Sequence, residues 1–472
     1  MLSLITKRKN AFFLLLIITF LFISKSVLAQ DTNELSDDEK LIIAKIEEMM
    51  DEQVQFLEKV VNINSGTLNL AGVRAVGEEF RTKFDDIGFT TSWLEMPTEM
   101  NRAGHLMARL SGYTSPGFSM MHNFDRDQMK ASELQSNTSV KRSGAKVLLL
   151  GHLDTVFPID SEFQKFEQEG NIAKGPGIAD MKSGNAVILF ALKAIREAGL
   201  LGGAHIDVVL TGDEESAGRP FSLSRGPMVD LAKENDVVLS FESGRINDAV
   251  VARRGSSNWK LEVTGKRAHS SGIFNDAVGA GAIFETARIL NAFYEEVRGE
   301  QYLTFNPGII VGGTNVDVDY ERSTGTAFGK TNVVAQTVKV SGGLRFLSEE
   351  QKERARDKMR NIVANNLPHT SAEINFEDRY PAMSPTAGNM ELFEMLKQVN
   401  ADLNYLPLAA VDPGLRGAGD ISFVAPYISG IDALGPSGRY GHTIYEELDM
   451  STIEPMTKRA AILIYRLIKQ EK

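Results

Sequence analysis

The sequence contains no cysteine. A disulfide framework, a thiolate nucleophile and a cysteine-based metal site are therefore excluded, and any metal ion must be held by histidines and carboxylates. An excess of positive charge is also absent, because the formal net charge is -11, which argues against a nucleic-acid partner. What is present, 43% hydrophobic and 24% charged residues over 472 positions, is typical of a globular protein long enough for two domains.

The N-terminus has the three-part pattern of a signal peptide. Basic residues 7–9 precede an apolar run at 11–23, and the small residues Val27 and Ala29 follow as a cleavage site. A membrane anchor is the alternative, but these 13 residues are short for a span that needs about 20. The rest of the sequence has no second long apolar run. We therefore expect residues 1–29 to be removed, leaving a secreted or periplasmic protein without stable membrane insertion.

Strands and helices alternate along the first half of the chain. Continuous apolar runs predict strands that are buried on both faces, at 147–150, 206–210 and 237–240. A further strand is expected at 105–110, and helices are expected at 36–60, 73–87 and 186–196. The polar stretch 111–145 is interpreted as a surface insertion. This alternation predicts an α/β fold with a mostly parallel sheet.

The pattern changes after about residue 250. Alternating strands are expected at 259–264, 308–317, 332–346 and 372–376, and helices at 277–297 and 349–366. The order strand, helix, strand, strand, helix, strand predicts an inserted α+β (ferredoxin-like) domain. We expect that domain at 252–380, between two parts of the first domain at 30–251 and 381–472. We also expect its strand at 259–264 to be an edge strand open to pairing.

His152 and Asp154 follow the first buried strand. Alternate residues of an extended chain point to the same side, so Asp154 can accept the far ring N–H of a metal-bound His152. The alternative is a buried histidine that is salt-bridged to an aspartate.

Two acidic segments follow further along the first domain. Asp180 lies in a glycine-rich stretch just before a buried helix, either as a ligand or as an N-cap. Asp213, Glu214 and Glu215 follow a buried strand, and clustered carboxylates repel one another unless a cation or a proton relieves them. A solvated loop is the alternative, but functional sites gather at the carboxyl edge of such a sheet.

Glu242 and His442 complete the set of candidates. Glu242 follows another apolar strand, and His442 lies in a glycine-rich loop near the C-terminus. Two histidines with several carboxylates suit two divalent ions that share one carboxylate, with zinc as the expected metal and cobalt or manganese as alternatives. Such a pair activates a water molecule, and a spare carboxylate can take its proton.

In this order the segments resemble those of the M20 metallopeptidases, of the glutamate carboxypeptidase type. The resemblance implies five metal ligands: His152 and Glu242 for one ion, Glu215 and His442 for the other, and Asp180 between them. It also implies that Glu214 is the general base and that Asp154 orients His152.

The resemblance extends to the inserted domain, which would be a lid and dimerisation domain. It implies that His269 stabilises the oxyanion in the site of the partner subunit, that Asn332 faces the substrate, and that Arg345 receives a substrate carboxylate. The sequence departs from the family pattern on the substrate side, at Met181, Ala335, Gly343 and an extra stretch at 317–326 that is expected to lengthen a hairpin.

The resulting hypothesis is a secreted di-zinc exopeptidase, active as a homodimer. It would hydrolyse the amide bond next to a free carboxylate in a small peptide or N-acyl amino acid. An N-acyl-amino-acid deacylase or dipeptidase on the same scaffold is the first alternative. A non-catalytic binding protein is the second, and the presence of Glu214 and all five candidate ligands argues against it.

Overall fold

The computed structural model describes residues 34–111, 144–320 and 322–469. The predicted signal peptide and almost all of the predicted insertion at 111–145 lie outside these residues. Within them, no helix has the length and apolar character needed to cross a membrane.

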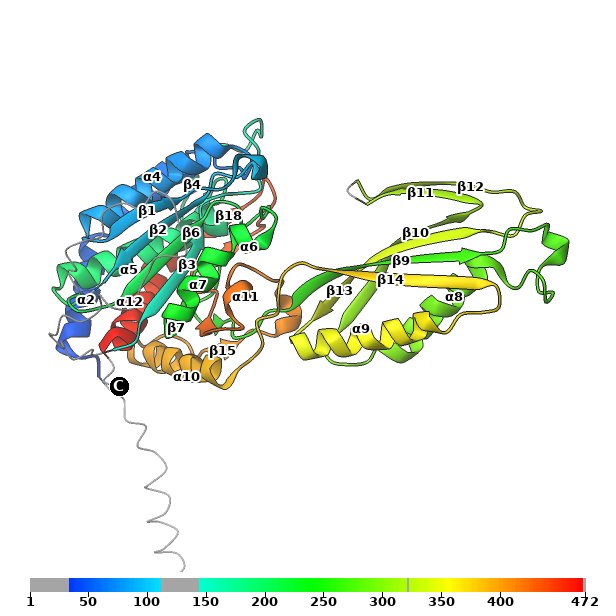
Figure 1. The fold of residues 1–472 in the computed structure, drawn as a ribbon. Helices are drawn as coiled ribbons and strands as arrows, with labels where there is room; N and C mark the ends of the chain where they lie inside the picture. The colour runs from blue at the N-terminus through cyan, green and yellow to red at the C-terminus, as the bar shows by residue number, and fades with distance from the viewer. Residues whose placement is uncertain (1–33, 112–143, 321, 470–472) are drawn as a thin grey trace, which may run out of the picture.

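The chain forms two lobes joined by two neighbouring linkers (Figure 1). The larger lobe contains the described residues up to 251 and those from 384 onward. The smaller lobe, residues 255–378, is called the lid below. In the linkers, Arg253 and Met383 exchange backbone hydrogen bonds of 2.9 and 3.0 Å, so the chain leaves and re-enters the larger lobe at one point.

A six-stranded sheet forms the centre of the larger lobe. Its order is β1-β2-β6-β3-β7-β16, with bounds Thr90–Leu94, His105–Leu110, Ile206–Thr211, Val147–His152, Val237–Ser240 and Ser429–Ile431. The last four strands in this order run parallel, and β1 and β2 add an antiparallel edge. The predicted α/β class with a mostly parallel sheet is confirmed.

Helices cover both faces of this sheet (Figure 1). Val147 and Leu149 of β3 face the core that contains α5, whereas Leu148 and Leu150 face a second core that contains α7 and α11. This explains why β3 is an unbroken apolar run. The helices are α2 (Asp37–Glu48), α3 (Met50–Val61), α4 (Leu70–Asp86), α5 (Ser183–Glu197), α6 (Phe221–Ser224), α7 (Gly226–Glu234), α10 (Ala387–Asp402), α11 (Ile421–Val424) and α12 (Ile453–Lys469).

Short strands complete the larger lobe. A four-stranded sheet has the order β17-β18-β5-β4, at Gly438–Arg439, Glu447–Asp449, Ile172–Lys174 and Glu167–Glu169. A parallel pair joins β8 (Asp248–Ala249) to β15 (Ala409–Ala410). The first of these sheets brings the C-terminal segment beside the loop that follows β5.

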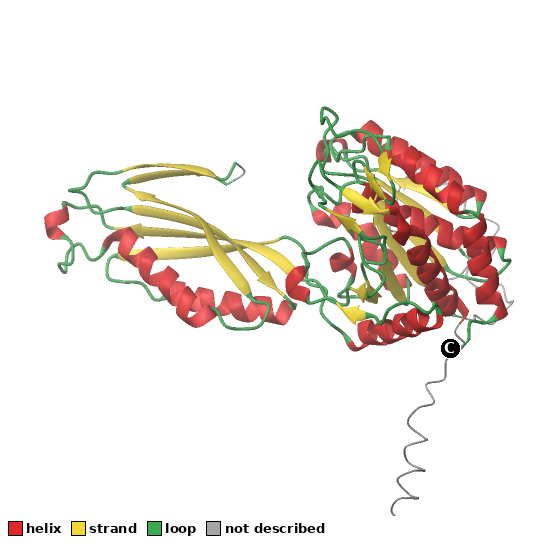
Figure 2. Ribbon diagram, turned by 180° about the vertical axis from the view of Figure 1, so that it is seen from behind, coloured by secondary structure: helices red, strands yellow, loops and turns green. Residues whose placement is uncertain are grey.

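The lid is an antiparallel sheet with two helices on one face (Figure 2). The strand order is β10-β13-β9-β14, with bounds Thr304–Gly313, Thr337–Phe346, Gly255–Gly265 and Thr370–Asp378. The helices are α8 (Gly281–Ala292) and α9 (Glu349–Ala364). Side chains such as Trp259 and Leu261 form a core beneath them, and the opposite face of the sheet carries no helix. The predicted ferredoxin-like order of elements is confirmed.

The predicted edge strand at 259–264 is wrong. This segment belongs to β9, which pairs with β13 on one side and β14 on the other. Its alternating pattern reflects a sheet covered on one face, and an interior strand shares that pattern with an edge strand. The edges are β10 and β14.

Three predicted boundaries also change. The helix expected at 36–60 is interrupted at Met49, and both resulting helices contact α5. The helix expected at 277–297 begins at Gly281 and ends in a π-helical turn, Phe293–Val297. The extra stretch near 317–326 forms a separate ribbon of β11 (Asn315–Asp319) and β12 (Thr324–Phe328) between β10 and β13.

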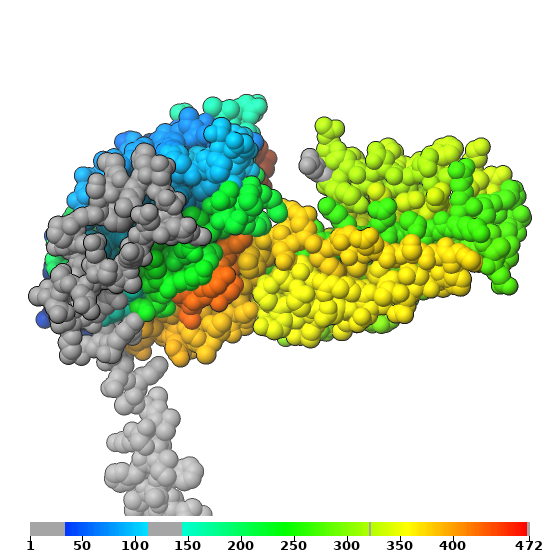
Figure 3. Space-filling view, in the orientation of Figure 1, coloured from blue at the N-terminus to red at the C-terminus, as the bar shows by residue number. Residues whose placement is uncertain are grey.

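The space between the lobes is open on one side. In Figure 3 the lobes meet along the linker side, and above it a gap separates the larger lobe from the near end of the lid. At the linker side, the Tyr380 hydroxyl donates to the Glu214 carbonyl at 3.2 Å, and Arg219 pairs with Glu377 at 3.3 Å.

Candidate metal centre

The candidate ligands come from strand ends that meet at one edge of the parallel sheet. His152 is the last residue of β3, Glu242 follows β7 by two positions, and Glu215 follows β6 by four. The carboxyl ends of adjacent parallel strands share an edge, where binding sites of α/β proteins form. The sheet therefore gathers these side chains before any ion is bound.

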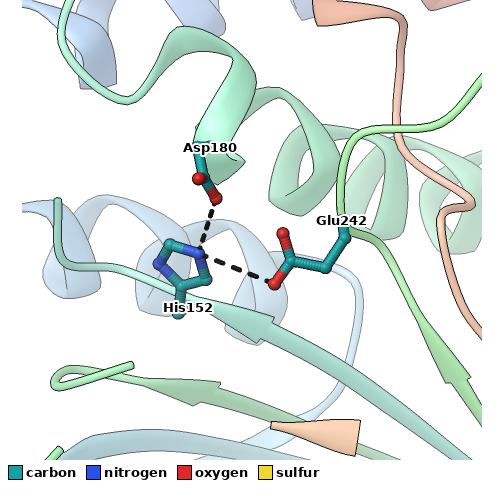
Figure 4. Close-up of side chains that lie close together, drawn as sticks. All are labelled: His152, Asp180 and Glu242. Carbon is teal, nitrogen blue, oxygen red and sulfur yellow. Dashed lines mark hydrogen bonds and ion pairs between the residues drawn. The ribbon is translucent and has the colours of Figure 1, made fainter. Parts of the chain in front are cut away.

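The first group of side chains consists of His152, Asp180 and Glu242 (Figure 4). The His152 Nε2 atom lies 3.1 Å from Asp180 Oδ1 and 3.9 Å from Glu242 Oε1. The histidine is fully buried, and one ring nitrogen is aimed at two carboxylates. The alternative was a buried His152 that pairs with one aspartate, whereas here His152 Nε2 is close to two carboxylates, those of Asp180 and Glu242.

The second group consists of Asp180, Glu215 and His442. The His442 Nε2 atom lies 3.1 Å from Asp180 Oδ2 and 3.1 Å from Glu215 Oε2. Asp180 thus directs one oxygen toward each histidine, which is the arrangement that a bridging carboxylate requires. The other Glu215 oxygen, Oε1, is buried without a hydrogen-bond partner.

Asp154 supports this arrangement from behind. The His152 Nδ1 atom lies 3.0 Å from the Asp154 carbonyl oxygen and 3.6 Å from its carboxylate. That carboxylate also accepts the backbone N–H groups of Glu214 at 2.9 Å and Glu215 at 3.2 Å, and the Thr67 hydroxyl at 2.6 Å. Asp154 therefore fixes both the imidazole and the acidic segment after β6.

Asp180 is not the N-cap of α5. The N-cap is Lys182, whose side chain makes no capping hydrogen bond, and the Asp180 carboxylate faces the two histidines instead. Its loop is held by Glu446, which accepts backbone N–H groups from this segment, and by the Ser243 hydroxyl, which donates to the Ala179 carbonyl at 2.8 Å. Glu446 was not predicted from the sequence, where its signal is its place four residues after His442.

The electrostatics of the site favour a bound cation. Burial and the Asp180 carboxylate raise the pKa of Glu242 to about 8. Hydrogen bonds to Asp180 and Glu215 raise the pKa of His442 to about 11. Burial also raises the pKa of Glu214 well above its usual value, with Asp420 among the carboxylates that add to the effect. The carboxylates outnumber the cations here, since Arg253 is the guanidinium group that interacts with both Glu242 and Glu214, and additional positive charge would stabilise the cluster.

Asp213, the first of the three consecutive acids after β6, has a different role from Glu214 and Glu215. Asp213 is buried and accepts the Arg225 Nη1 group at 2.6 Å and the Gly218 N–H at 2.7 Å. Arg225 also donates through Nε to Asp420 at 2.7 Å. This buried network supports the segment that carries Glu214. Arg225 and Asp420 were not predicted from the sequence, because they are 195 positions apart in the chain.

The three predicted substrate residues lie in the lid. Arg345 is exposed on β13, near the linkers, and no acid in the described ranges forms an ion pair with it. His269 and Asn332 are neighbours, since the Ser270 N–H donates to the Asn332 carbonyl at 2.9 Å. The segment after β9, which carries His269, and the segment before β13, which carries Asn332, lie at the end of the lid remote from the larger lobe (Figure 1). One chain therefore does not bring His269 and Asn332 to its own cluster.

The residues present fit a pair of divalent ions. In each group the candidate ligand atoms all lie within 4.8 Å of one another. Each group combines one imidazole with two carboxylates, a donor set that suits zinc. The unpartnered Glu215 oxygen supplies a free acceptor at the second group.

The chain is similar in sequence to several curated proteins. Carboxypeptidase G2 of Pseudomonas sp. (strain RS-16) is 26% identical over 432 residues, which cover 88% of this chain and 89% of that protein. Succinyl-diaminopimelate desuccinylase of Coxiella burnetii is 23% identical over 327 residues, covering 66% of this chain and 81% of that protein.

Solved structures show the same fold. Aminopeptidase PepT from Bacillus cereus has a TM-score of 0.65 at 18% identity, over 89% of this chain and 98% of that one. The YXEP protein of Bacillus subtilis, a dinuclear metal binding peptidase, has a TM-score of 0.60 at 12% identity, over 90% and 99%. Residues 148–466 match the model of the family that the sequence motifs predicted. The chain belongs to peptidase family M20/M25/M40.

Proposed function

We propose that this protein is a di-zinc exopeptidase that hydrolyses an amide bond next to a free carboxylate, in a small peptide or an N-acyl amino acid. The observation that carries the proposal is the placement of Asp180 between two histidines, with one oxygen 3.1 Å from each. Glu215 and Glu242 complete the two groups, and Glu214 remains as a carboxylate with another role.

Each residue then has a separate task. Two bound ions would polarise the scissile carbonyl and lower the pKa of the attacking water. Glu214 takes the proton that this water loses and delivers it to the leaving amine nitrogen. Burial raises the pKa of Glu214 well above its usual value, and this direction favours a carboxyl group that takes up a proton and later returns it. Asp154 keeps His152 in a single orientation throughout.

Arg345 is the reason for proposing a substrate with a free carboxylate. Burial and the nearby Arg254 and Arg379 guanidinium groups lower the pKa of Arg345, so this part of the lid carries clustered positive charge in an acidic protein. Gly343, two residues earlier on β13, has open space where a side chain would be. An anionic group can therefore approach the guanidinium groups directly.

The arginine cluster lies where the lid meets the linkers, and one of its members contacts the larger lobe. Arg254 donates to the Gly414 carbonyl at 3.1 Å. In the same loop, Arg416 donates to the Ser243 carbonyl at 2.9 Å, next to Glu242. One short loop of the larger lobe thus connects the cationic cluster with the candidate ligands.

The Arg345→Lys variant tests the carboxylate assignment. A lysine keeps the charge but loses the planar fork, and a charged hydrogen bond contributes about 1.5–3 kcal/mol. We expect kcat/KM on free-carboxylate substrates to fall by roughly one to two orders of magnitude, with little change on C-terminal amide analogues. The matched control is Arg360→Lys, an exposed arginine on α9. Equal losses on acids and amides would make Arg345 a structural residue.

A panel of substrates tests the reaction itself. The mature protein is stripped with a chelator, reloaded with zinc, cobalt or manganese, and assayed on N-acyl-glutamate, N-acyl-aspartate and simple dipeptides. The proposal expects metal-dependent release of the C-terminal residue. N-acyl hydrolysis without preference for that residue would favour a deacylase, which the likeness to a succinyl-diaminopimelate desuccinylase supports as the second candidate. No turnover with any metal would refute both.

The proposal includes export and self-association. Cleavage after Ala29 would deliver the protein outside the cytoplasm. A homodimer formed through the lid would bring His269 and Asn332 to the site of the partner. Exposed apolar side chains on the lid support this assembly: Phe274, Ile283, Phe284 and Ile310 are each more than half exposed, and β10 is an edge strand.

A further inference from the structure

The Glu446 carboxylate accepts hydrogen bonds from the backbone of the loop that carries Asp180, the residue between the two histidines. The Glu446 side chain is 1% exposed. Oε1 accepts the N–H groups of Ala179 at 2.8 Å and Asp180 at 3.0 Å, and Oε2 accepts the Gly177 N–H at 3.4 Å. Among the described residues no salt bridge neutralises this carboxylate, and the buried Lys182 of the same segment interacts with it electrostatically. Every partner it has belongs to the loop that carries Asp180.

The backbone N–H groups of Gly177, Ala179 and Asp180 depend on this carboxylate, although other hydrogen bonds also hold the loop, such as that from the Lys182 N–H to the Gly177 carbonyl at 2.8 Å. Gly177 has a φ of 73°, and Asp180 has non-helical angles of -124° and 89°, so helical hydrogen bonds do not use their N–H groups. Unpaired buried N–H groups are costly, and Glu446 satisfies three of them. On the opposite side of the loop the Ser243 hydroxyl binds the Ala179 carbonyl.

The same short segment also delivers His442. Only three residues separate His442 from Glu446, and β18 continues directly from Glu446 to pair with β5, just before the Asp180 loop. The position of His442 relative to Asp180 is therefore fixed by a segment that is tied at both ends. Ligands held in place by their supporting hydrogen bonds lose little freedom when an ion binds.

We propose that Glu446 is a positioning residue that sets the metal affinity of the site, by holding Asp180 and His442 at the spacing that the two ions require. The inference rests on the proposed metal centre. Glu446 contacts no substrate in this role, and it acts through the backbone of the Asp180 loop and through the short segment that it shares with His442.

The test compares Glu446→Gln and Glu446→Ala with the wild-type mature protein. Glutamine keeps one acceptor oxygen, but its amide group presents a donor to the N–H of Gly177 or Ala179. Alanine removes the acceptors altogether. The matched control is Glu447→Gln, which changes the adjacent, half-buried carboxylate on β18. Zinc affinity is measured by competition with a chelating indicator.

We expect Glu446→Gln to bind zinc about 10- to 100-fold more weakly than the wild type, as losses of supporting hydrogen bonds typically do. Glu447→Gln should bind like the wild type. Melting curves of the metal-free proteins separate positioning from general stability. A positioning role weakens zinc binding at temperatures where metal-free Glu446→Gln is fully folded, whereas a merely structural role lowers the melting temperature and leaves affinity unchanged.

Unchanged zinc affinity in folded Glu446→Gln overturns the inference, even if Glu446→Ala fails to fold. A wild-type protein that binds no zinc, cobalt or manganese overturns the proposed function instead. The two failures are therefore distinguished by the wild-type titration.

Discussion

Glu214 and Glu215 are adjacent in the chain but have different surroundings. One Glu215 oxygen lies 3.1 Å from His442, which places this side chain among the candidate ligands. The Glu214 carboxylate has no hydrogen-bond partner among the residues that the structure describes, although its backbone is held at both ends by Asp154 and Tyr380. A carboxylate whose backbone is held in place and which binds no other described group is available for proton transfer.

The Glu214→Gln variant should therefore separate chemistry from metal binding. Glutamine has nearly the same shape but cannot accept the proton, so we expect kcat to fall by about 100- to 10,000-fold. Metal content, measured by elemental analysis, should stay at the wild-type level. Glu215→Gln is the comparison, because it should lose metal as well as activity. Normal turnover by Glu214→Gln would show that another group is the base.

Metal binding should release protons. Hydrogen bonds to Asp180 and Glu215 raise the pKa of His442 to about 11, so its imidazole is protonated at pH 7 in the metal-free protein. A ligand histidine must be neutral, so an ion has to displace this proton, and metal affinity should fall as the pH falls. Calorimetry of zinc binding at pH 7, in buffers of different ionisation enthalpy, should report at least one proton released per protein. Identical heats in all buffers would contradict this.

The sequence predicted the residues that meet at the site better than those that support it. His152, Glu215 and Glu242 each follow an apolar strand, and parallel strands place their ends together by geometry alone. Glu446 leaves no such signal, because its partners are backbone N–H groups and any residue type supplies them. Arg225 was missed for a related reason, since its acid partners lie 12 and 195 positions away.

At the scale of elements, the linker that follows β14 joins the lid to the candidate base. The Tyr380 hydroxyl donates to the Glu214 carbonyl at 3.2 Å. Its ring packs against Phe423, with centroids 4.9 Å apart, and against Phe221 at 6.0 Å. A movement of Tyr380 in the linker would therefore act, through this hydrogen bond, on the backbone of the segment that carries Glu214.

The Tyr380→Phe variant removes this hydrogen bond and keeps the ring. We expect kcat to fall several-fold while zinc affinity is unchanged, because Glu214 loses support and the candidate ligands do not. The free energy of unfolding should decrease by about 0.5–1.5 kcal/mol. Tyr427→Phe, at an exposed position, is the control. Wild-type kcat in Tyr380→Phe would show that the contact has no effect on the base.

At this scale the sequence predicted strand and helix correctly at 259–264 and 36–60, but it did not predict which other elements these segments contact. The alternation at 259–264 correctly predicted a strand with one covered face, but the residues of a strand do not encode how many strands flank it. The spacing of apolar residues at 36–60 likewise predicted helix, but not the break at Met49 that lets both α2 and α3 contact α5. Tertiary contacts decide both features.

At the scale of the whole molecule, His269 lies in a segment remote from the cluster of its own chain. A site that uses His269 therefore needs a second copy of the protein. Sedimentation at assay concentration should show a dimer, and dilution to monomer should abolish activity. A fully active monomer would contradict the proposed assembly.

Mixed subunits give a sharper measurement. His269→Ala and Glu214→Gln should each be nearly inactive alone. A dimer that contains one of each has one complete site, formed by Glu214 of the first and His269 of the second. Free exchange of equal amounts should restore about a quarter of wild-type activity, because half of the dimers are mixed and each has one working site. No recovery after proven exchange would show that the sites are not shared.

The hydrogen-bonded pair of Arg253 and Met383 has a consequence for how such a protein can change. The chain leaves and re-enters the larger lobe at this one pair of residues. The segment between them, called the cassette, can therefore be removed without separating the chain ends that the larger lobe must join. All five candidate ligands lie outside the cassette, and Arg345, His269 and Asn332 lie inside it. If the proposed roles hold, the candidate metal ligands and the candidate substrate residues are encoded by separate stretches of the gene, and exchange of the cassette should change substrate preference while the five ligands stay in place.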